Sequence, residues 1–171
     1  MKNLIKIFTL FLVSVLIVSC DDEFDGKYVR DSIPEVPIIF EGATTVGFNP
    51  YYTISFGAGS AINVTVTVPA GAPLQIKQIN NIVAGATSLN VASLAGTSGQ
   101  YLAAPVAVNG TSYTLSTTIA EWNSKVSAAS GKITSGPTGT ALYNERALMF
   151  SLTMSDDSVI IPVQCRIRVL P

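Results

Sequence analysis

The chain has 171 residues, of which 48% are hydrophobic and 12% charged, and its formal net charge at pH 7 is −1. This composition excludes a disordered chain, which needs low hydrophobicity and high charge, and the lack of clustered basic residues argues against nucleic acid as a partner. The sequence contains no histidine, which excludes a Ser-His-Asp catalytic triad and every histidine-based zinc site.

The amino terminus has the pattern of a secretory signal. Lys2 and Lys6 are followed by a mainly apolar stretch over residues 7–18 and then by Ser19. A basic head, a short apolar stretch and a small residue predict a signal peptide over residues 1–19. The stretch is well short of the roughly 20 residues that a membrane-spanning helix needs. The alternative is a buried core helix.

A cysteine ends this apolar stretch. The run Leu16-Ile17-Val18-Ser19-Cys20 resembles a bacterial lipobox, in which the cysteine thiol receives a diacylglycerol and becomes the first residue of the mature chain. The resemblance implies that Cys20 is a lipid anchor, and two or three acyl chains anchor a protein stably where one does not. The alternative is a disulfide between Cys20 and Cys165.

An acidic segment follows the cysteine directly. Its acidic residues are Asp21, Asp22, Glu23 and Asp25. The segment resembles the tether of surface lipoproteins in the Bacteroidota group of bacteria, where such acids direct the protein to the outer face of the outer membrane. We therefore expect residues 20–34 to be a lipidated, flexible tether and residues 35–171 to be one folded domain. A plain solvated linker is the alternative for the acids.

The first half of the domain shows the two-residue period of β-strands. Pro37 places a first strand, residues 36–41, at a sheet edge. Residues 51–56 and 62–68 alternate in polarity around a Gly-Ala-Gly-Ser turn, which predicts an antiparallel hairpin. Residues 74–83 and a segment beginning at 89–91 are weaker strand predictions. Residues 101–108 contain a proline and predict an edge strand or a loop.

The second half has clearer signals. After the turn signal Asn109-Gly110, residues 113–119 alternate, and a capping box at Thr118–Glu121 predicts a short helix over residues 119–129. Residues 148–154 and 159–169 are predicted strands joined by a turn at Asp156-Asp157, with Cys165 on the apolar face of the second. We expect that strand to lie centrally in its sheet and Cys165 to be a buried, inert thiol.

These elements predict an all-β fold. About seven short strands, each with one apolar face, require two sheets that close on each other. We therefore expect an antiparallel, immunoglobulin-like β-sandwich with one short helix. The Cys-Trp-Cys pattern of true immunoglobulin domains is absent, so the likeness is a loose one.

The acidic residues do not predict an active site. Asp156 and Asp157 are expected to form a turn, Glu121 to cap the helix, and Glu145 to lie at the solvated start of a strand. No loop has the series of oxygen ligands that calcium needs. We expect a protein that is not an enzyme and has no cofactor or metal.

Exposed aromatic residues are the candidate ligand contacts. Sugar-binding sandwiches use flat aromatic rings as platforms for sugars, and the candidates are Tyr51, Tyr101 and Tyr143. The alternative for these tyrosines is an ordinary place in a strand. Trp122 shares a helical stripe with apolar residues and is expected in the core instead.

Two short motifs resemble the O-glycosylation site of Bacteroidota, an Asp followed by Ser or Thr and an aliphatic residue. They are Asp31-Ser32-Ile33 and Asp157-Ser158-Val159. The resemblance implies glycosylation at Ser32 and Ser158.

The plan of the chain is similar to that of small Bacteroidota surface lipoproteins, some of which accompany glycan-uptake systems. The leading hypothesis is a non-enzymatic, lipid-anchored protein of the outer membrane, exposed on the cell surface, that binds a glycan or scaffolds an outer-membrane protein. The alternative is an assembly subunit that associates through an exposed strand edge. The lack of charge between Gly42 and Ala120, where Lys77 is the one charged residue, suits such a contact surface.

Lipidation at Cys20 is directly testable. We expect radiolabelled palmitate to be incorporated into the chain, and Cys20→Ser to abolish the label and release the protein from the membrane fraction, because lipidation requires the thiol. Failure of the label to incorporate, or a Cys20→Ser protein that stays in the membrane fraction, would contradict this assignment.

Overall fold

The computed structural model describes residues 36–57, 60–137 and 141–171, and these form one compact unit, Val36–Pro171. Within them nine strands occur: β1 (Ile39–Glu41), β2 (Tyr51–Ser55), β3 (Ala61–Thr67), β4 (Ile76–Gly85), β5 (Val106–Gly110), β6 (Ser112–Thr118), β7 (Asn144–Met154), β8 (Val159–Ile160) and β9 (Cys165–Leu170). One α-helix, α3 (Ile119–Lys125), and two 3₁₀ helices, η2 (Val91–Ala95) and η3 (Ala129–Gly131), complete the described elements.

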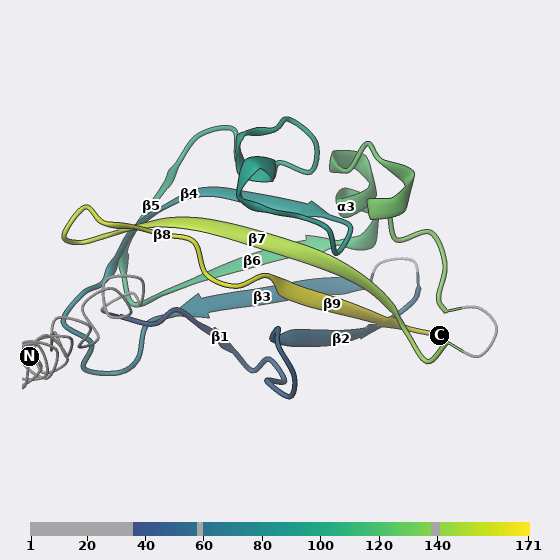
Figure 1. Ribbon diagram of the computed structural model, residues 1–171, viewed down its shortest axis with the longest axis horizontal. Coiled ribbons are helices and arrows are strands. Elements are labelled where there is room, and N and C mark those ends of the chain that lie inside the picture. The colour runs from purple at the N-terminus through teal and green to yellow at the C-terminus, as the bar shows by residue number, and fades with distance from the viewer. Residues whose placement is uncertain (1–35, 58–59, 138–140) are drawn as a thin grey trace, which may run out of the picture. The chain divides into compact units, whose positions relative to one another are not determined.

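The strands form two sheets, as expected for an all-β sandwich (Figure 1). The smaller sheet has the order β1-β3-β6. The larger has the order β2-β9-β7-β4-β5, and β8 pairs with the far end of β7. The prediction of an edge position for the first strand is confirmed by β1, and that of a central last strand by β9, which lies between β2 and β7.

The hairpin predicted from residues 51–56 and 62–68 is wrong. β2 joins the larger sheet and β3 the smaller, so the turn between them carries the chain from one sheet to the other. β2 pairs in parallel with β9, with Tyr51 opposite Arg166 and Ser55 opposite Leu170. The expectation of a wholly antiparallel sandwich therefore fails at this edge. Alternation shows that a strand has two faces but not which strand it pairs with.

The last predicted strand is also interrupted. β8 ends at Ile160 and β9 begins at Cys165, and Pro162 lies between them. Proline has no N–H to give to the ladder, so the chain leaves β7 after Ile160 and pairs with it again from Cys165. Val159 and Val163, which alternation places inside, are 61% and 58% exposed, whereas Cys165 is fully buried as predicted.

The core lies between the inner faces of the two sheets. It is joined across the sandwich by an edge-on contact of the Phe40 and Phe150 rings, whose centroids are 5.7 Å apart. The larger sheet contributes Ile76, Ile79, Ile82, Leu148, Phe150, Leu152, Met154, Cys165, Ile167 and Val169. In β4 the buried isoleucines are three residues apart, because register shifts between Ile76 and Gln78 and between Ile79 and Asn81 reset the alternation.

One end of the core is closed by α3. Thr118 caps the helix by accepting a hydrogen bond from the Glu121 N–H (3.2 Å), so the predicted helix start is confirmed. The helix ends at Lys125, four residues before the predicted end. The Trp122 ring is fully buried, and its indole N–H donates to the Gly131 carbonyl (2.9 Å), which confirms the core position expected for it.

The segment from Ala86 to Gln100 covers the outer face of the larger sheet. A strand was predicted to begin at residues 89–91, but the chain forms η2 there, which packs on β4 and β7. The segment is held by hydrogen bonds such as Ala84 N–H to Gly99 O (2.9 Å) and Asn81 Nδ2 to Leu94 O (2.6 Å). Gly99 has a φ of +76°, and a Cβ there would lie 2.0 Å from the Ala84 oxygen. Only glycine fits this contact.

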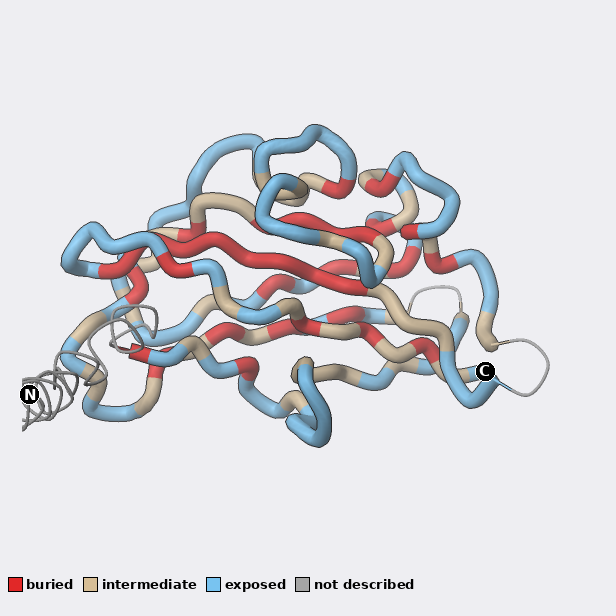
Figure 2. The backbone as a smooth tube through the Cα atoms, viewed as in Figure 1, coloured by how far each residue is buried: buried red, intermediate tan, exposed pale blue. Residues whose placement is uncertain are grey.

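With this cover, β7 is buried on both faces. All eight residues from Ala147 to Met154 are buried, and Figure 2 shows them as an unbroken buried run, whereas β9 alternates. Sequence alternation predicts only one buried face for this strand. Strands covered on both sides are apolar throughout, and the run Ala-Leu-Met-Phe contains that signal.

Candidate functional site

Charged and aromatic side chains gather where β2, β9 and the start of β7 lie side by side. Residues paired across neighbouring strands project from the same face of a sheet. The register pairs Tyr51 with Arg166, and Glu145 of β7 with Arg168 of β9. The alternate residues of β9, Cys165 and Ile167, are buried in the core. Tyr51, Glu145, Arg166 and Arg168 therefore project from the outer face.

Arg168 is held between two tyrosines. Its guanidinium carbon lies 3.6 Å from the Tyr51 ring centroid and 4.3 Å from that of Tyr143. Its Nε donates to Glu145 Oε1 at 2.8 Å. This hydrogen bond with Glu145 raises the pKa of Arg168. We call Tyr51, Arg168 and Tyr143 the tyrosine–arginine stack. A guanidinium over aromatic faces is a favourable contact, so these residues are fixed before any ligand arrives.

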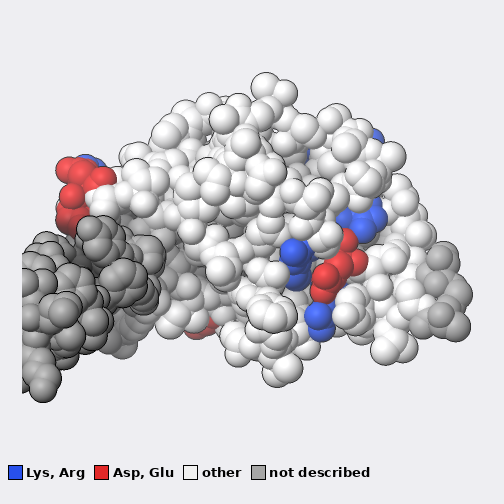
Figure 3. Space-filling model, viewed as in Figure 1, with Lys and Arg blue, Asp and Glu red and all other residues white. Residues whose placement is uncertain are grey.

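A pocket of about 250 Å³ lies beside the stack. It is lined by the loop Val46–Asn49 and by Glu145, Arg166 and Arg168. Figure 3 shows basic and acidic side chains gathered on this part of the face, in a surface that otherwise carries few charges. Two backbone hydrogen bonds of 2.9 Å, between Thr44 and Tyr51, close the base of the loop. Phe48 is fully exposed at the rim.

Arg166 differs from Arg168 in having no acidic partner among the described residues. Among the described residues the ion pairs are Lys77–Asp157, Lys125–Glu121 and Arg168–Glu145. The Nη1 atom of Arg166 is buried without a hydrogen-bond partner in that part of the chain. A buried donor left unpaired costs about 1–3 kcal/mol, and more when it is charged.

Two of the three tyrosines singled out in the sequence thus come together, and the third does not. The Tyr101 ring packs edge-on against Trp122 at 6.5 Å, and its hydroxyl is hydrogen-bonded to Thr117 Oγ1 (3.2 Å). Burial raises the pKa of Tyr101 to about 12. Tyr101 is therefore a packing residue at the α3 end of the core.

Sequence reasoning missed the charged members of the site. Alternation along the predicted strand 159–169 puts Arg166 and Arg168 on the face opposite Cys165, which gives them no role beyond that of a polar face, and Glu145 was expected only at a solvated strand start. The alternation of Arg166 and Arg168 on one face was visible, but the parallel neighbour β2, which brings Tyr51 to them, was not. Phe48 has no periodic pattern around it and carried no signal.

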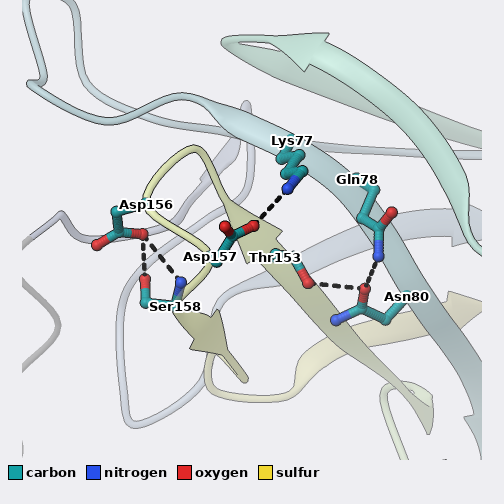
Figure 4. A network of polar contacts seen from close by, with 7 residues as sticks. All are labelled: Lys77, Gln78, Asn80, Thr153, Asp156, Asp157 and Ser158. Atoms are coloured by element: carbon teal, nitrogen blue, oxygen red, sulfur yellow. Dashed lines mark hydrogen bonds and ion pairs between the residues drawn. The ribbon is translucent and has the colours of Figure 1, made fainter.

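Ser158 lies in the exposed turn between β7 and β8. Its hydroxyl and its N–H both donate to Asp156 Oδ1, at 2.7 and 3.0 Å (Figure 4). Both hydrogen bonds lower the pKa of Asp156, and the one from the Ser158 hydroxyl has the larger effect. Asp157 has a φ of 67° and pairs with Lys77, which supports the predicted turn role of both aspartates. Ser158 is exposed, but its hydroxyl is hydrogen-bonded within the turn.

The same close-up includes a network of uncharged groups between β4 and β7. Asn80 Oδ1 accepts hydrogen bonds from Gln78 Nε2 (2.8 Å) and Thr153 Oγ1 (2.9 Å) (Figure 4). Thr153 is 9% exposed, so these bonds satisfy polar groups that are largely removed from water. The network therefore links the two strands.

The remaining predicted site residues lie outside the described residues. These are Cys20, Asp21, Asp22, Glu23, Asp25 and Ser32. Within the described ranges, no group of three or more Cys, Asp or Glu side chains could hold a metal ion. No helix in those ranges is long and apolar enough to cross a membrane.

No protein-family model matches the sequence, and no curated protein sequence shows significant similarity to it.

The buried ionisable groups predict an alkaline loss of stability. Burial raises the pKa of the Cys165 thiol to about 12 and that of Tyr101 to about 12. In the unfolded chain these groups ionise near pH 9 and 10, so between pH 9 and 12 the unfolded state binds fewer protons. The free energy of unfolding should therefore fall as pH rises, by up to about 1.4 kcal/mol per pH unit for each group.

Urea unfolding at pH 8, 9.5 and 10.5 measures this loss. Cys165→Ala and Tyr101→Phe should each make the decline shallower, because each removes one titrating group. A stability that is constant across this window would contradict the burial assigned to both side chains.

Proposed function

We propose that this chain is a non-enzymatic, lipid-anchored protein of the Bacteroidota type, exposed on the outer membrane, whose immunoglobulin-like sandwich binds a ligand. The ligand surface is the tyrosine–arginine stack with the adjoining pocket, and a glycan is the ligand class that it suits. Cys20 is the anchor, the acids from Asp21 to Asp25 are the export tether, and Ser32 and Ser158 are the candidate glycosylation sites.

The observation that carries the proposal is the convergence of Tyr51 and Tyr143 on Arg168. These tyrosines are 92 residues apart in the sequence, yet both rings lie within 4.3 Å of one guanidinium carbon. Backbone pairing of β2 with β9 holds Tyr51 in place. A surface fixed before binding loses little side-chain entropy when a ligand arrives.

The chemistry of the buried thiol supports a binding role over a catalytic one. Thiolates, not thiols, act as nucleophiles, and burial keeps Cys165 protonated with a pKa of about 12. Glu145, the acid that lines the pocket, accepts a hydrogen bond from Arg168 Nε at 2.8 Å. Orientation and charge recognition are what this arrangement offers a ligand.

A glycan array probed with the full-length chain in detergent micelles tests the proposal. We expect binding to at least one glycan class, and Tyr143→Ala should weaken it by 10-fold or more, because a stacking platform is lost. Tyr101→Phe is the matched control and should bind as the unchanged chain does. An array without any binding would remove the support for a glycan ligand.

A second candidate function, assembly through a strand edge, is favoured by β6. Two hydrogen bonds, Val68 N–H to Thr111 O (2.9 Å) and Ile119 N–H to Ser60 O (3.4 Å), show which residues of β6 direct their backbone N–H and C=O groups toward β3. Since hydrogen-bonded pairs alternate along an antiparallel ladder, the N–H and C=O groups of Ser112, Thr114 and Ser116 point away from β3. No strand in the described part of the chain pairs with that side of β6.

This edge also lacks the usual protection. β6 has the sequence Ser-Tyr-Thr-Leu-Ser-Thr-Thr, without a charge or a proline. Exposed edges are normally blocked by such residues. Two copies of β6 can pair antiparallel about Thr114. Ser112 then lies opposite Ser116 of the other copy, so the outward N–H and C=O groups of one strand face those of the other.

Sedimentation velocity of the chain in micelles distinguishes this candidate. If β6 assembles, the chain forms dimers and Thr114→Pro makes it monomeric, since proline removes an outward N–H without touching the β3 ladder. Thr114→Val keeps the N–H and should dimerise as before. A chain that is monomeric at every concentration would argue against assembly of two copies through this edge.

A further inference from the structure

We propose that the pocket between Val46–Asn49 and β9 binds the carboxylate of an acidic sugar, with Arg166 as the residue that recognises it. The inference rests on the proposed ligand-binding function and specifies the ligand class. It follows from the charges around the pocket, its size and the side chains at its rim.

The charges leave one cation without a partner. Glu145 and Arg168 are joined at 2.8 Å, so their charges offset each other. Arg166 takes part in no ion pair with a described residue, and its Nη1 atom is buried and unpaired. The pocket therefore has a net charge of +1. A singly charged carboxylate matches it, whereas a doubly charged phosphate would leave one negative charge beside Glu145.

The backbone of Arg166 is held in place by β2. Its N–H donates to the Pro50 carbonyl at 2.8 Å, and the residue pairs with Tyr51 in the β2–β9 register. A guanidinium presents its donors in a planar fork that matches the two oxygens of a carboxylate. An incoming carboxylate would offer acceptors to a side chain that has no acidic partner in the described structure.

The size and rim of the pocket suit a sugar ring. A volume of about 250 Å³ is below the roughly 300–1,000 Å³ of pockets that enclose drug-sized ligands. The pocket thus accommodates a single residue of a chain and leaves its neighbours outside. Phe48, which lines the pocket, is fully exposed, and Tyr143, which contacts the lining residue Arg168 from outside the pocket, is 38% exposed. These rings offer flat apolar surfaces to the C–H faces of adjoining sugars.

Calorimetry on the full-length chain in detergent micelles tests the inference. The probes are trigalacturonate and its trimethyl ester, which have the same rings but differ in charge. We expect trigalacturonate to bind at least 10-fold more tightly than the ester, and the difference to shrink as salt is added. Arg166→Gln should abolish the preference and leave both probes at the affinity of the ester.

Two further variants separate recognition from folding. Lys77→Gln removes the same charge from β4, where Lys77 pairs with Asp157, and should leave the preference unchanged. Glu145→Gln removes the acid beside the pocket and should raise the affinity for trigalacturonate several-fold. If Arg166→Gln does not fold, as judged by its thermal unfolding, the gain in Glu145→Gln and a partial loss in Arg166→Lys still decide the question.

The outcomes distinguish this inference from the proposed function. Equal binding of acid and ester, both weakened by Tyr143→Ala, overturns the carboxylate assignment and leaves a glycan-binding protein. Binding of an acidic tripeptide such as triglutamate, lost in Arg166→Gln, without binding of trigalacturonate overturns the sugar assignment. Absence of binding to every probe in this series, together with a blank glycan array, overturns both.

Discussion

Burial of β7 on both faces is the constraint on which the rest of the domain depends. Its inner face supplies Leu148, Phe150, Leu152 and Met154 to the core. At ~1.5–3 kcal/mol per buried side chain, these four stabilise the fold by about 6–12 kcal/mol before the loss of conformational entropy is subtracted. Its outer face carries Ala147 and Met149, which are also buried. The sandwich therefore needs a third layer, which the segment around η2 supplies.

The same strand connects the core to the site. The buried run begins at Ala147, and Glu145 lies just before it, opposite Arg168. Arg166 and Arg168 alternate with Cys165, Ile167 and Val169, each of which is fully buried. The inward side chains thus hold β9 in one register, and that register sets where the arginines emerge. The strand positions of Glu145, Arg166 and Arg168 therefore follow from core packing, whereas the pocket beside them also depends on the loop Val46–Asn49.

Local patterns in the sequence predicted the local structure well. The start of α3 at the Thr118 cap, the core position of Trp122, the edge position of β1 and the burial of Cys165 all follow from short-range spacing. The sequence did not predict which strands pair. The parallel pairing of β2 with β9 joins residues more than 100 apart, and nothing near either strand encodes it.

The same distinction explains what was found of the site. Tyr51 and Tyr143 were recognisable as aromatics in exposed positions, whereas their meeting at Arg168 depends on tertiary structure. Arg166 could not be singled out, because its distinguishing property is that it forms no ion pair with any described residue, which only the tertiary structure shows. The register shifts in β4 were hidden for a similar reason, since a bulge shows itself only against the partner strand.

In the loop beside the pocket, the residues that face a ligand are different from those that hold the fold. Thr45 to Phe48 are exposed, and the hydrogen bonds that close the loop come from Thr44 and Tyr51 at its base. Substitutions at Val46 or Phe48 therefore remove no buried contact and should be nearly neutral for folding. Related proteins could diversify what they recognise by varying these few positions, while the residues that keep the sandwich intact stay the same.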